Sequence, residues 1–555
     1  MMQMTGAQLI VRLLERQGVR TIAGIPGGAI LPLYDALGGS ELIHHVLARH
    51  EQGAGFMAQG MARASGQPAV CFASSGPGAT NLVTAIADAF LDSIPMVAIT
   101  GQVPLSMIGT DAFQEVDIYG ITVPITKHNF LVRSVEELLT VIPDAFRIAM
   151  SGRPGPVLVD VPKDVQNQLI SFTDFPPRVV SDSLPPVDAE AIEEAARLIN
   201  EAEQPVLYLG GGVVHSGASA LAVTLAEQAC MPTTMTLMGL GAMPVDHPLS
   251  IGMLGMHGAR YTNFVLEEAD VLVCVGARFD DRAVGKAAQF CPRAKIVHID
   301  VDPSELHKIK RAHVAIHADV GSALEALLPR IRKSMRKRWL SHVDSLRSRF
   351  PMQLPGMDDP RTHYGLVRAV AAALDDDAII TTDVGQHQMW VAQAYPFRRP
   401  RQWMTSGGLG TMGFGVPTAM GAALAEPDRT VVCFSGDGSL MMNVQEFATL
   451  AEENLNVKIV LMNNSSLGLV YQQQNLFYGK RVFASKYGAG PDFIKIAEGF
   501  GIGAVDLDQA ANPRAALAQA LQTPGPCLIH ASIDREQFVY PMVPPGAANT
   551  EMIGG

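Results

Sequence analysis

The sequence predicts an α/β protein of three domains built on mainly parallel sheets. The chain has 555 residues, enough for three domains of ordinary size. Hydrophobic residues make up 48% of it and charged residues 17%, with 52 glycines, as in glycine-rich α/β enzymes. Segments 69–100 and 431–462 each show a hydrophobic strand, a helical pattern and a second strand. Such a unit forms a right-handed crossover, so we expect its two strands to be parallel.

Two proline-rich stretches, 175–186 and 350–360, divide the chain. We therefore expect domains over residues 1–172, 188–345 and 360–555. The first and third share the strand–helix–strand plan and are expected to be related folds.

Charge and cysteine usage limit the classes of partner. The net charge of −12 argues against nucleic acid or an anionic membrane. The six cysteines show neither a CxxC pair nor zinc spacing, which predicts reduced thiols in a cytoplasmic protein. Residues 5–8 look like a helix start with a capping box rather than a targeting segment, and no apolar run is long enough to span a bilayer.

The most informative segment is 430–464. Asp437 stands between two glycines after a predicted strand, and Asn464 is the second of two asparagines after the next strand. Parallel strands place both at the carboxyl edge of the sheet, where open α/β sheets bind ligands. A carboxylate and an amide oxygen suit Mg²⁺, and the glycines let a diphosphate approach. An ordinary turn explains the Gly-Asp-Gly sequence alone, but the paired asparagines favour the metal site.

This pattern resembles the diphosphate-binding motif of thiamine diphosphate (ThDP) enzymes, and further motifs resemble the acetohydroxyacid synthase catalytic subunit of the isozyme I type. The resemblance runs from near Thr5 to the C-terminus. It implies two related ThDP-binding domains, one for the pyrimidine ring and one for the diphosphate and Mg²⁺, flanking a Rossmann-like FAD-binding domain. The implied cofactors are ThDP, Mg²⁺ and FAD.

Glu51 follows a probable strand at 43–47. Taken alone it is an ordinary carboxylate at a helix start, stabilised by the helix dipole. The resemblance implies that it is the activating glutamate, which hydrogen bonds to the aminopyrimidine ring so that the exocyclic nitrogen can accept the thiazolium C2 proton. Enclosure in an apolar pocket would raise the pKa of this carboxyl group.

The resemblance also assigns the other cofactor contacts. Met412 would be the wedge between the two rings of ThDP, and the Gly410 carbonyl would accept a hydrogen bond from the aminopyrimidine. His387 is equally well explained as a cap or core residue. The implied ThDP contacts are Pro26, Glu51, Val384, Gln386, His387, Gly410, Met412, Gly438 and Ser439, and the Mg²⁺ ligands are Asp437, Asn464 and a carbonyl near Ser466.

The middle domain does not satisfy the dinucleotide fingerprint, because the third glycine position after Gly210 and Gly212 is His215. This weakens an NAD interpretation. The resemblance instead implies FAD without a net redox role. The implied contacts are Arg153, Gly211, Gly212, Thr236, Met256, His257, Arg278, Asp300 and Asp319.

The remaining candidates concern the substrates. The loop 24–28 is explained by a structural turn, but the resemblance places Gly28 near the reacting carbon, where a missing side chain leaves room. Gln114 is expected to hydrogen bond to reaction intermediates, and Lys163 to line an access channel. Charge pattern alone favours a salt-bridge cluster at 278–282. The resemblance selects Arg282, whose planar fork suits the carboxylate of a second 2-keto acid.

Gln473 departs from the pattern, since many family members carry tryptophan there. It predicts weak discrimination between pyruvate and 2-ketobutyrate. Segment 540–546 is either a disordered tail or, as the resemblance implies, a lid over the active site.

The resemblance predicts synthesis of 2-acetolactate or 2-aceto-2-hydroxybutyrate from small 2-keto acids, in a homodimer with shared active sites and with a small regulatory subunit. A pyruvate oxidase is the nearest alternative. A glyoxylate carboligase fits less well because that family lacks the glutamate found here as Glu51. A non-catalytic nucleotide-binding protein would not need the intact motif residues.

Overall fold

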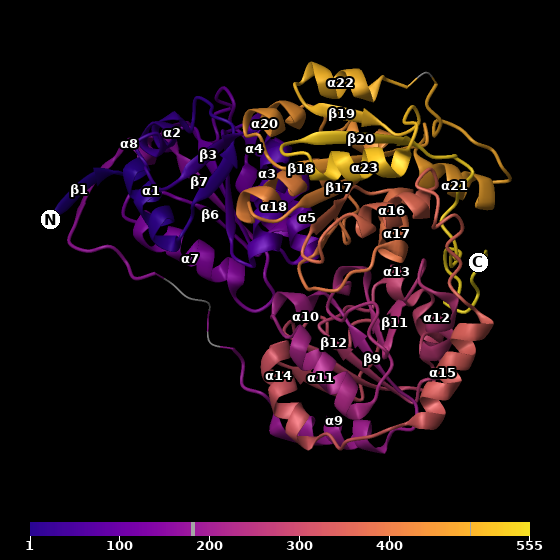
Figure 1. Cartoon of the computed structure of the whole chain (residues 1–555). Coiled ribbons are helices and arrows are strands. Elements are labelled where there is room, and N and C mark those ends of the chain that lie inside the picture. Colours follow the sequence, from indigo (N-terminus) through magenta and orange to yellow (C-terminus); the bar gives the residue numbers. More distant parts are fainter. Residues whose placement is uncertain (179–181, 183, 489, 555) are drawn as a thin grey trace.

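The computed structural model describes residues 1–178, 182, 184–488 and 490–554 and contains three α/β units (Figure 1). Each unit has a six-stranded sheet whose paired strands are all parallel. The predicted fold class is confirmed. An antiparallel pair, β1 (Met2–Thr5) with β8 (Leu169–Phe172), adds a small second sheet. The boundaries drawn from the sequence stay predictions, and residues 179–181 and 183 of the first break, with 489 and 555 of the third domain, lie outside the described residues.

The first unit has the strand order β3-β2-β4-β5-β7-β6. Its strands are β2 (Thr21–Gly24), β3 (His44–Leu47), β4 (Ala69–Ala73), β5 (Met96–Gln102), β6 (His128–Leu131) and β7 (Pro156–Pro162). Its helices are α1 (Gly6–Gln17), α2 (Leu31–Leu37), α3 (Glu51–Ser65), α4 (Pro77–Asn81), α5 (Val83–Asp92), α6 (Ile118–Thr122), α7 (Leu138–Met150) and α8 (Lys163–Asn167), with 3₁₀ turns η1 (Leu105–Met107) and η2 (Val123–Ile125). The capping box predicted at the start of α1 is present between Thr5 and Gln8.

The middle unit has the order β11-β10-β9-β12-β13-β14, a Rossmann-like sheet. Its strands are β9 (Pro205–Leu209), β10 (Thr233–Met235), β11 (Ser250–Met253), β12 (Val271–Val275), β13 (Lys295–Asp300) and β14 (Val314–His317). Its helices are α9 (Ala189–Glu201), α10 (Gly211–His215), α11 (Ser219–Ala229), α12 (Arg260–Glu268), α13 (Asp281–Val284), α14 (Val320–Leu327) and α15 (Lys337–Arg349), with η3 (Leu237–Gly239), η4 (Ala287–Gln289) and η5 (Leu328–Arg330).

The third unit has the order β16-β15-β17-β18-β20-β19. Its strands are β15 (Ile379–Thr382), β16 (Trp403–Met404), β17 (Val431–Gly436), β18 (Val457–Asn463), β19 (Gly503–Asp506) and β20 (Cys527–Ser532). Its helices are α16 (His363–Ala372), α17 (Gln386–Ala394), α18 (Gly415–Ala425), α19 (Asp437–Leu440), α20 (Glu446–Glu452), α21 (Gly468–Phe477), α22 (Phe493–Gly499) and α23 (Pro513–Gln522).

One sequence expectation is corrected in this unit. The helical pattern between β17 and β18 suggests a single crossover helix, but the structure divides it into α19 and α20. The side chain of Asn443 donates to the Gly413 carbonyl oxygen at 2.6 Å, which fixes the chain between the two helices in a turn. The strands on both sides are parallel as predicted.

The first and third units share one core. Helix α3 packs against α18 along much of its length, and buried residues of both belong to the same apolar cluster. The crossing requires glycine, because a Cβ on Gly60 would lie 2.1 Å from the Thr418 carbonyl oxygen and one on Gly421 would lie 1.9 Å from that of Met57. Figure 1 shows these units side by side above the middle unit, so that all three meet near the centre.

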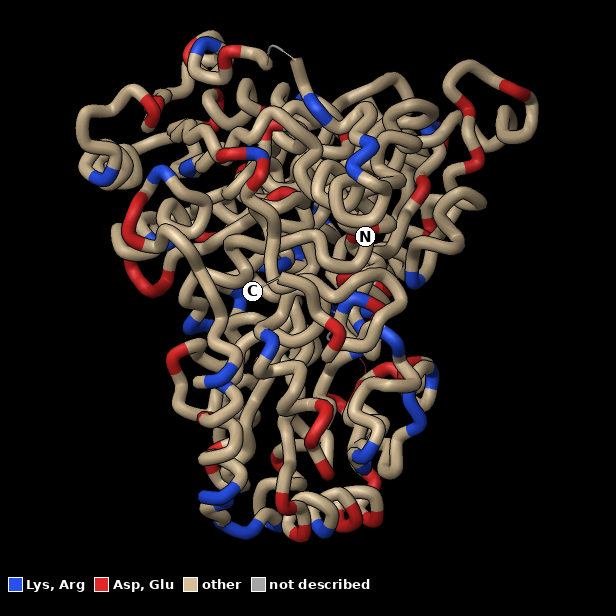
Figure 2. Tube along the Cα trace, turned by 90° about the vertical axis from the view of Figure 1, so that its right-hand side faces the viewer, with Lys and Arg blue, Asp and Glu red and all other residues tan. Residues whose placement is uncertain are grey.

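Acidic and basic residues are interspersed over the described trace, including the middle unit at the bottom of Figure 2. Among the described residues, no helix is both long and apolar enough to cross a membrane.

Candidate active site

The candidate residues of the first unit follow the carboxyl ends of neighbouring strands. Pro26 and Gly28 follow β2, Glu51 follows β3, Gln114 lies in the loop after β5, and Lys163 follows β7. Together with β4, these strands are consecutive in the sheet, in the order β3-β2-β4-β5-β7. Because they are parallel, the loops that follow them gather at one edge of the sheet, where α/β sheets bind ligands.

Glu51 is the first residue of α3 and is half-buried in the single chain. Its Oε2 accepts a hydrogen bond from Asn81 Nδ2 at 2.9 Å. A Cβ on Gly78 would lie 3.3 Å from Glu51 Oε1, and one on Gly76 would lie 2.9 Å from the Gln114 carbonyl oxygen. The turn after β4 therefore brings Glu51 and the Gln114 loop together. Sequence reasoning missed Asn81, whose signal is only its position on α4.

The candidates of the third unit also follow strand ends. Val384, Gln386 and His387 follow β15, and Gly410 and Met412 follow β16. The remaining candidates lie at the ends of the next two strands in the sheet: Asp437, Gly438 and Ser439 after β17, and Asn464 and Ser466 after β18.

Oxygen atoms gather at the ends of β17 and β18. Asp437 Oδ1 accepts the Asn464 N–H at 3.3 Å, and Asn464 Oδ1 accepts the Ser466 hydroxyl at 3.0 Å. All three residues are buried, and burial raises the pKa of Asp437 to about 6. A buried carboxylate beside an amide oxygen is the kind of donor set that suits Mg²⁺ shared with a phosphate.

His387 has unused hydrogen-bonding capacity beside this cluster. Its Nε2 is buried and has no hydrogen-bond partner among the described residues, and burial lowers its pKa to about 3, so the ring is neutral. A buried polar atom without a partner is costly unless a ligand satisfies it. The ring lies against the backbones of Gly385 and Gly436. A diphosphate at the strand ends fits this site. The side chain of Gln386, by contrast, already bonds to Asn464 at 2.9 Å and Gln472 at 3.1 Å.

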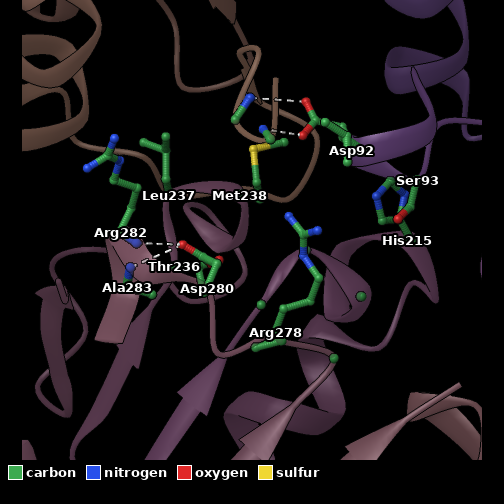
Figure 3. Close-up of a pocket in the computed structure, with 18 of the residues that line it drawn as sticks. Asp92, Ser93, His215, Thr236, Leu237, Met238, Arg278, Asp280, Arg282 and Ala283 are labelled. Carbon is green, nitrogen blue, oxygen red and sulfur yellow. Dashed lines mark hydrogen bonds between the residues drawn. The ribbon is translucent and has the colours of Figure 1, made fainter. Parts of the chain in front are cut away.

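A cavity of about 660 Å³ lies where the three units meet (Figure 3), within the size range of cofactor sites. The structure brings all nine predicted FAD residues to its walls: Arg153, Gly211, Gly212, Thr236, Met256, His257, Arg278, Asp300 and Asp319. Figure 3 shows the Arg278 guanidinium directed into the cavity.

The cavity's polar walls suit a dinucleotide. Burial raises the pKa of Asp300 to about 6, and Arg153 contacts Asp302 at 3.3 Å and Glu305 at 3.1 Å. A Cβ on Gly212 would lie 2.7 Å from the Gly276 Cα, so only glycine allows this approach of the two backbones. These features fit FAD. The buried carboxylates can accept hydrogen bonds from ribose hydroxyls, and the glycine backbone leaves room for the ligand.

The same cavity extends to the third unit, where Val384, Gly410 and Gln473 line it together with Arg282. The Arg282 side chain is 66% exposed, and its nearest carboxylate is Asp281 at 3.7 Å. Its guanidinium is thus available to an anionic ligand. Glu51, Gly28, Gln114 and Lys163 of the first unit are not among the residues that line this cavity.

The C-terminal segment is ordered, and the disordered-tail alternative is wrong for its described residues. Val539 exchanges two hydrogen bonds with the Gln472 side chain, at 2.9 and 3.0 Å. The Val543 N–H donates to the Met256 carbonyl oxygen at 2.9 Å, and the buried Met542 lines the cavity. The segment therefore forms part of the cavity wall.

Comparison with known proteins agrees with this geometry. Three family descriptions match successive parts of the chain: "Thiamine pyrophosphate enzyme, N-terminal TPP binding domain" over residues 4–121, "central domain" over 192–327 and "C-terminal TPP binding domain" over 383–531. The acetolactate synthase isozyme 1 large subunit of Escherichia coli K12 is 63% identical over 99% of this chain and 98% of its own length. The chain belongs to the acetolactate synthases of the thiamine pyrophosphate enzyme family.

Other acetolactate synthases cover the chain equally well. The isozyme 2 large subunit of Escherichia coli K12 is 48% identical over 99% of both chains, and acetolactate synthase 1, chloroplastic, of Zea mays is 47% identical over 99% of this chain and 88% of its own length. The resemblance drawn from the motifs is confirmed. Thiamine pyrophosphate is another name for ThDP, so the two matched terminal domains also confirm that cofactor class.

Proposed function

We propose that the chain catalyses acetolactate synthesis, by decarboxylating pyruvate and joining the two-carbon fragment to a second pyruvate or to 2-ketobutyrate. This is the first common step of valine and isoleucine biosynthesis. The proposal rests on 63% identity to an acetolactate synthase over 99% of this chain. Glu51, Asp437 and Asn464 also lie at the strand ends of two ThDP-binding units. When bound, ThDP supplies the electron sink for the decarboxylation.

In this proposal Glu51 would hold a proton at the aminopyrimidine, and Met412 would pack against the cofactor. Asp437, Asn464 and the backbone near Ser466 would hold Mg²⁺. His387, with Val384, Gly438 and Ser439, receives the diphosphate. The buried oxygens and the partnerless His387 Nε2 support this assignment.

The cavity between the units would hold FAD. Arg278 and Asp300 support this because they present a cation and a buried carboxylate to a space of suitable size. Arg282 lines the same cavity together with residues of the third unit. Its planar guanidinium would bind the carboxylate of the second 2-keto acid. Gln473 faces the same space and would set the preference among these acids.

We also propose a homodimer in which the first unit of one subunit completes the site on the third unit of its partner. Segments of both units expose large apolar side chains, among them Phe113 in the loop after β5, at 87%, and Phe483 in the segment after α21, at 83%. Exposed apolar groups of this kind mark interaction surfaces. Lys163, Gly28 and Gln114 would reach the substrate only across this interface.

Two further observations support a small regulatory subunit and a cytoplasmic location. The bacterial relatives are named large subunits, which supports a small regulatory partner. All six cysteines are free, in keeping with a reducing cytoplasm.

The test is product analysis with pyruvate, ThDP, Mg²⁺ and FAD, recording acetolactate and oxygen uptake together. The proposal predicts acetolactate without matching oxygen uptake, and none with Glu51→Gln. Oxygen uptake with acetate would point to a pyruvate oxidase, and acetaldehyde alone would mean that the role of Arg282 is wrong.

A further inference from the structure

A buried charge cluster lies where the three units meet, outside the groups used above. Arg63 of α3 and two carboxylates of α5, Asp88 and Asp92, have side chains that are almost fully buried. Arg63 lies 2.8 Å from Asp92 and 3.6 Å from Asp88. One guanidinium therefore serves two buried carboxylates, and Asp88 Oδ2 has no hydrogen-bond partner among the described residues.

Such a cluster is a poor device for stability alone. Burying an incompletely compensated charge costs free energy that a well-packed apolar pair would avoid. Burial and the neighbouring carboxylate raise the pKa of Asp88 to about 6, which reflects that cost. The hydrogen bonds that the two carboxylates accept from a loop of the third unit indicate another role for the cluster.

Both carboxylates hold the glycine-rich loop 406–413 of the third unit. Asp92 accepts the N–H groups of Gly407 at 3.1 Å and Gly408 at 2.7 Å. Asp88 accepts the hydroxyls of Ser406 and Thr411, the latter at 3.0 Å. Four hydrogen bonds thus tie this loop to α5 of the first unit. Figure 3 shows the two bonds made by Asp92, with Met238 beside them.

The loop borders both proposed cofactor sites. Gly407, Gly408 and Gly410 line the cavity, and a Cβ on Gly407 would lie 2.3 Å from the Met238 Sδ. The same loop carries Met412, the proposed wedge of the ThDP site. A ligand that packs against the cavity side of the loop thus restricts the segment that receives ThDP.

We propose that Asp88 and Asp92 are positioning residues that clamp loop 406–413, and that through this loop the FAD cavity and the ThDP site bind their ligands cooperatively. The inference rests on the proposed function. It gives FAD a task without electron transfer. Because coupling between two binding sites is reciprocal, each cofactor raises the affinity for the other by the same factor.

The test is calorimetric titration of the cofactor-free assembled protein with ThDP and Mg²⁺, with and without saturating FAD, followed by the reverse titration with FAD. In the wild type, FAD should raise ThDP affinity at least about fivefold, the lower end of ordinary allosteric coupling, with the same factor in the reverse direction. Equal ThDP affinity with and without FAD would overturn the proposal.

Two variants remove the clamp to different extents. Asp92→Ala deletes both backbone bonds and should reduce the coupling to under about twofold. Thr411→Val deletes only the hydroxyl bond at a half-exposed residue, so it should fold and show intermediate coupling. The matched control is Thr234→Val, which loses a buried hydroxyl bond to the Gly252 carbonyl oxygen at 2.8 Å in the middle unit and should keep wild-type coupling.

Wild-type coupling in Thr411→Val would overturn the clamp even if Asp92→Ala failed to fold. If only the clamp proposal is wrong, the wild type still binds ThDP and produces acetolactate. Failure of the proposed function would remove both in the wild type and would overturn the clamp with them.

Discussion

Glu446 links the third unit to the start of the helix that carries Glu51. Its Oε1 accepts the backbone N–H of Arg49 at 3.0 Å and that of His50 at 2.9 Å, and its Oε2 lies 3.2 Å from the Arg49 nitrogen. The side chain is fully buried. A carboxylate from one unit thus fixes the backbone just before the proposed activating glutamate of another.

Replacing Glu446 by alanine leaves two part-buried backbone N–H groups, those of Arg49 and His50, without their side-chain acceptor. A fully buried group of this kind costs about 1–3 kcal/mol, so about 2–6 kcal/mol is the upper bound for the two, divided between folding and the placement of Glu51. If about 2 kcal/mol falls on that placement, cofactor activation slows roughly 30-fold. Glutamine keeps the Oε1 acceptor, so Glu446→Gln should stay within about fivefold of the wild type.

The assay is the rate at which deuterium replaces the C2 proton of bound ThDP, measured by quenched-flow NMR. This rate reports activation through Glu51 and does not depend on the second substrate. Gly53→Ala provides an independent perturbation, because its Cβ would lie 2.4 Å from Glu446 Oε1 and displace the carboxylate. Exchange at the wild-type rate in a properly assembled Glu446→Ala protein would show that Glu446 does not position Glu51.

Burial raises the pKa of Glu446 to about 7 from its ordinary 4.5, so its contribution to folding stability is full below pH 4.5 and is lost as pH rises through 7. Relative to Glu446→Gln, the wild type should therefore lose about 2.5 kcal/mol of unfolding free energy between pH 5 and 8. A constant difference in unfolding free energy between the two proteins across that range would contradict this. Arg282→Met should divert product from acetolactate to acetaldehyde at least about tenfold, since a charge-assisted hydrogen bond is worth about 1.5–3 kcal/mol; an unchanged product distribution by chromatography would exclude the role given to Arg282. Gln473→Trp should raise the preference for 2-ketobutyrate when both acids compete, and a constant product ratio would sink that assignment.

Much of the fold could be predicted because hydrophobic periodicity and strand-end motifs are local. The two strands expected in segment 69–100 are β4 and β5, and those expected in segment 431–462 are β17 and β18. The single crossover helix predicted between β17 and β18 was wrong. The turn that divides it into α19 and α20 is fixed by a hydrogen bond from Asn443 to Gly413, which lies in a different segment. Periodicity does not report such contacts.

The candidate site divides in the same way. Asp437 and Asn464 could be paired from the sequence because each follows a predicted strand of one βαβ unit. Glu446, Asp88 and Asp92 could not be singled out, since each acts on a segment more than 300 residues away, such as Asp92 on Gly408 at a separation of 316. An acidic residue in an amphipathic helix carries no local sign of such a partner.

The proposed active site is completed by the strand-end loops of two subunits. The direct measurement is acetolactate production by an equal mixture of Glu51→Gln and Asp437→Ala chains, denatured and reassembled together. If Glu51 of one subunit serves Asp437 of its partner, every mixed dimer has one intact site, so the mixture should recover about a quarter of wild-type activity. If each site lies within one chain, every site carries a lesion, and the mixture should stay as inactive as the two parent variants.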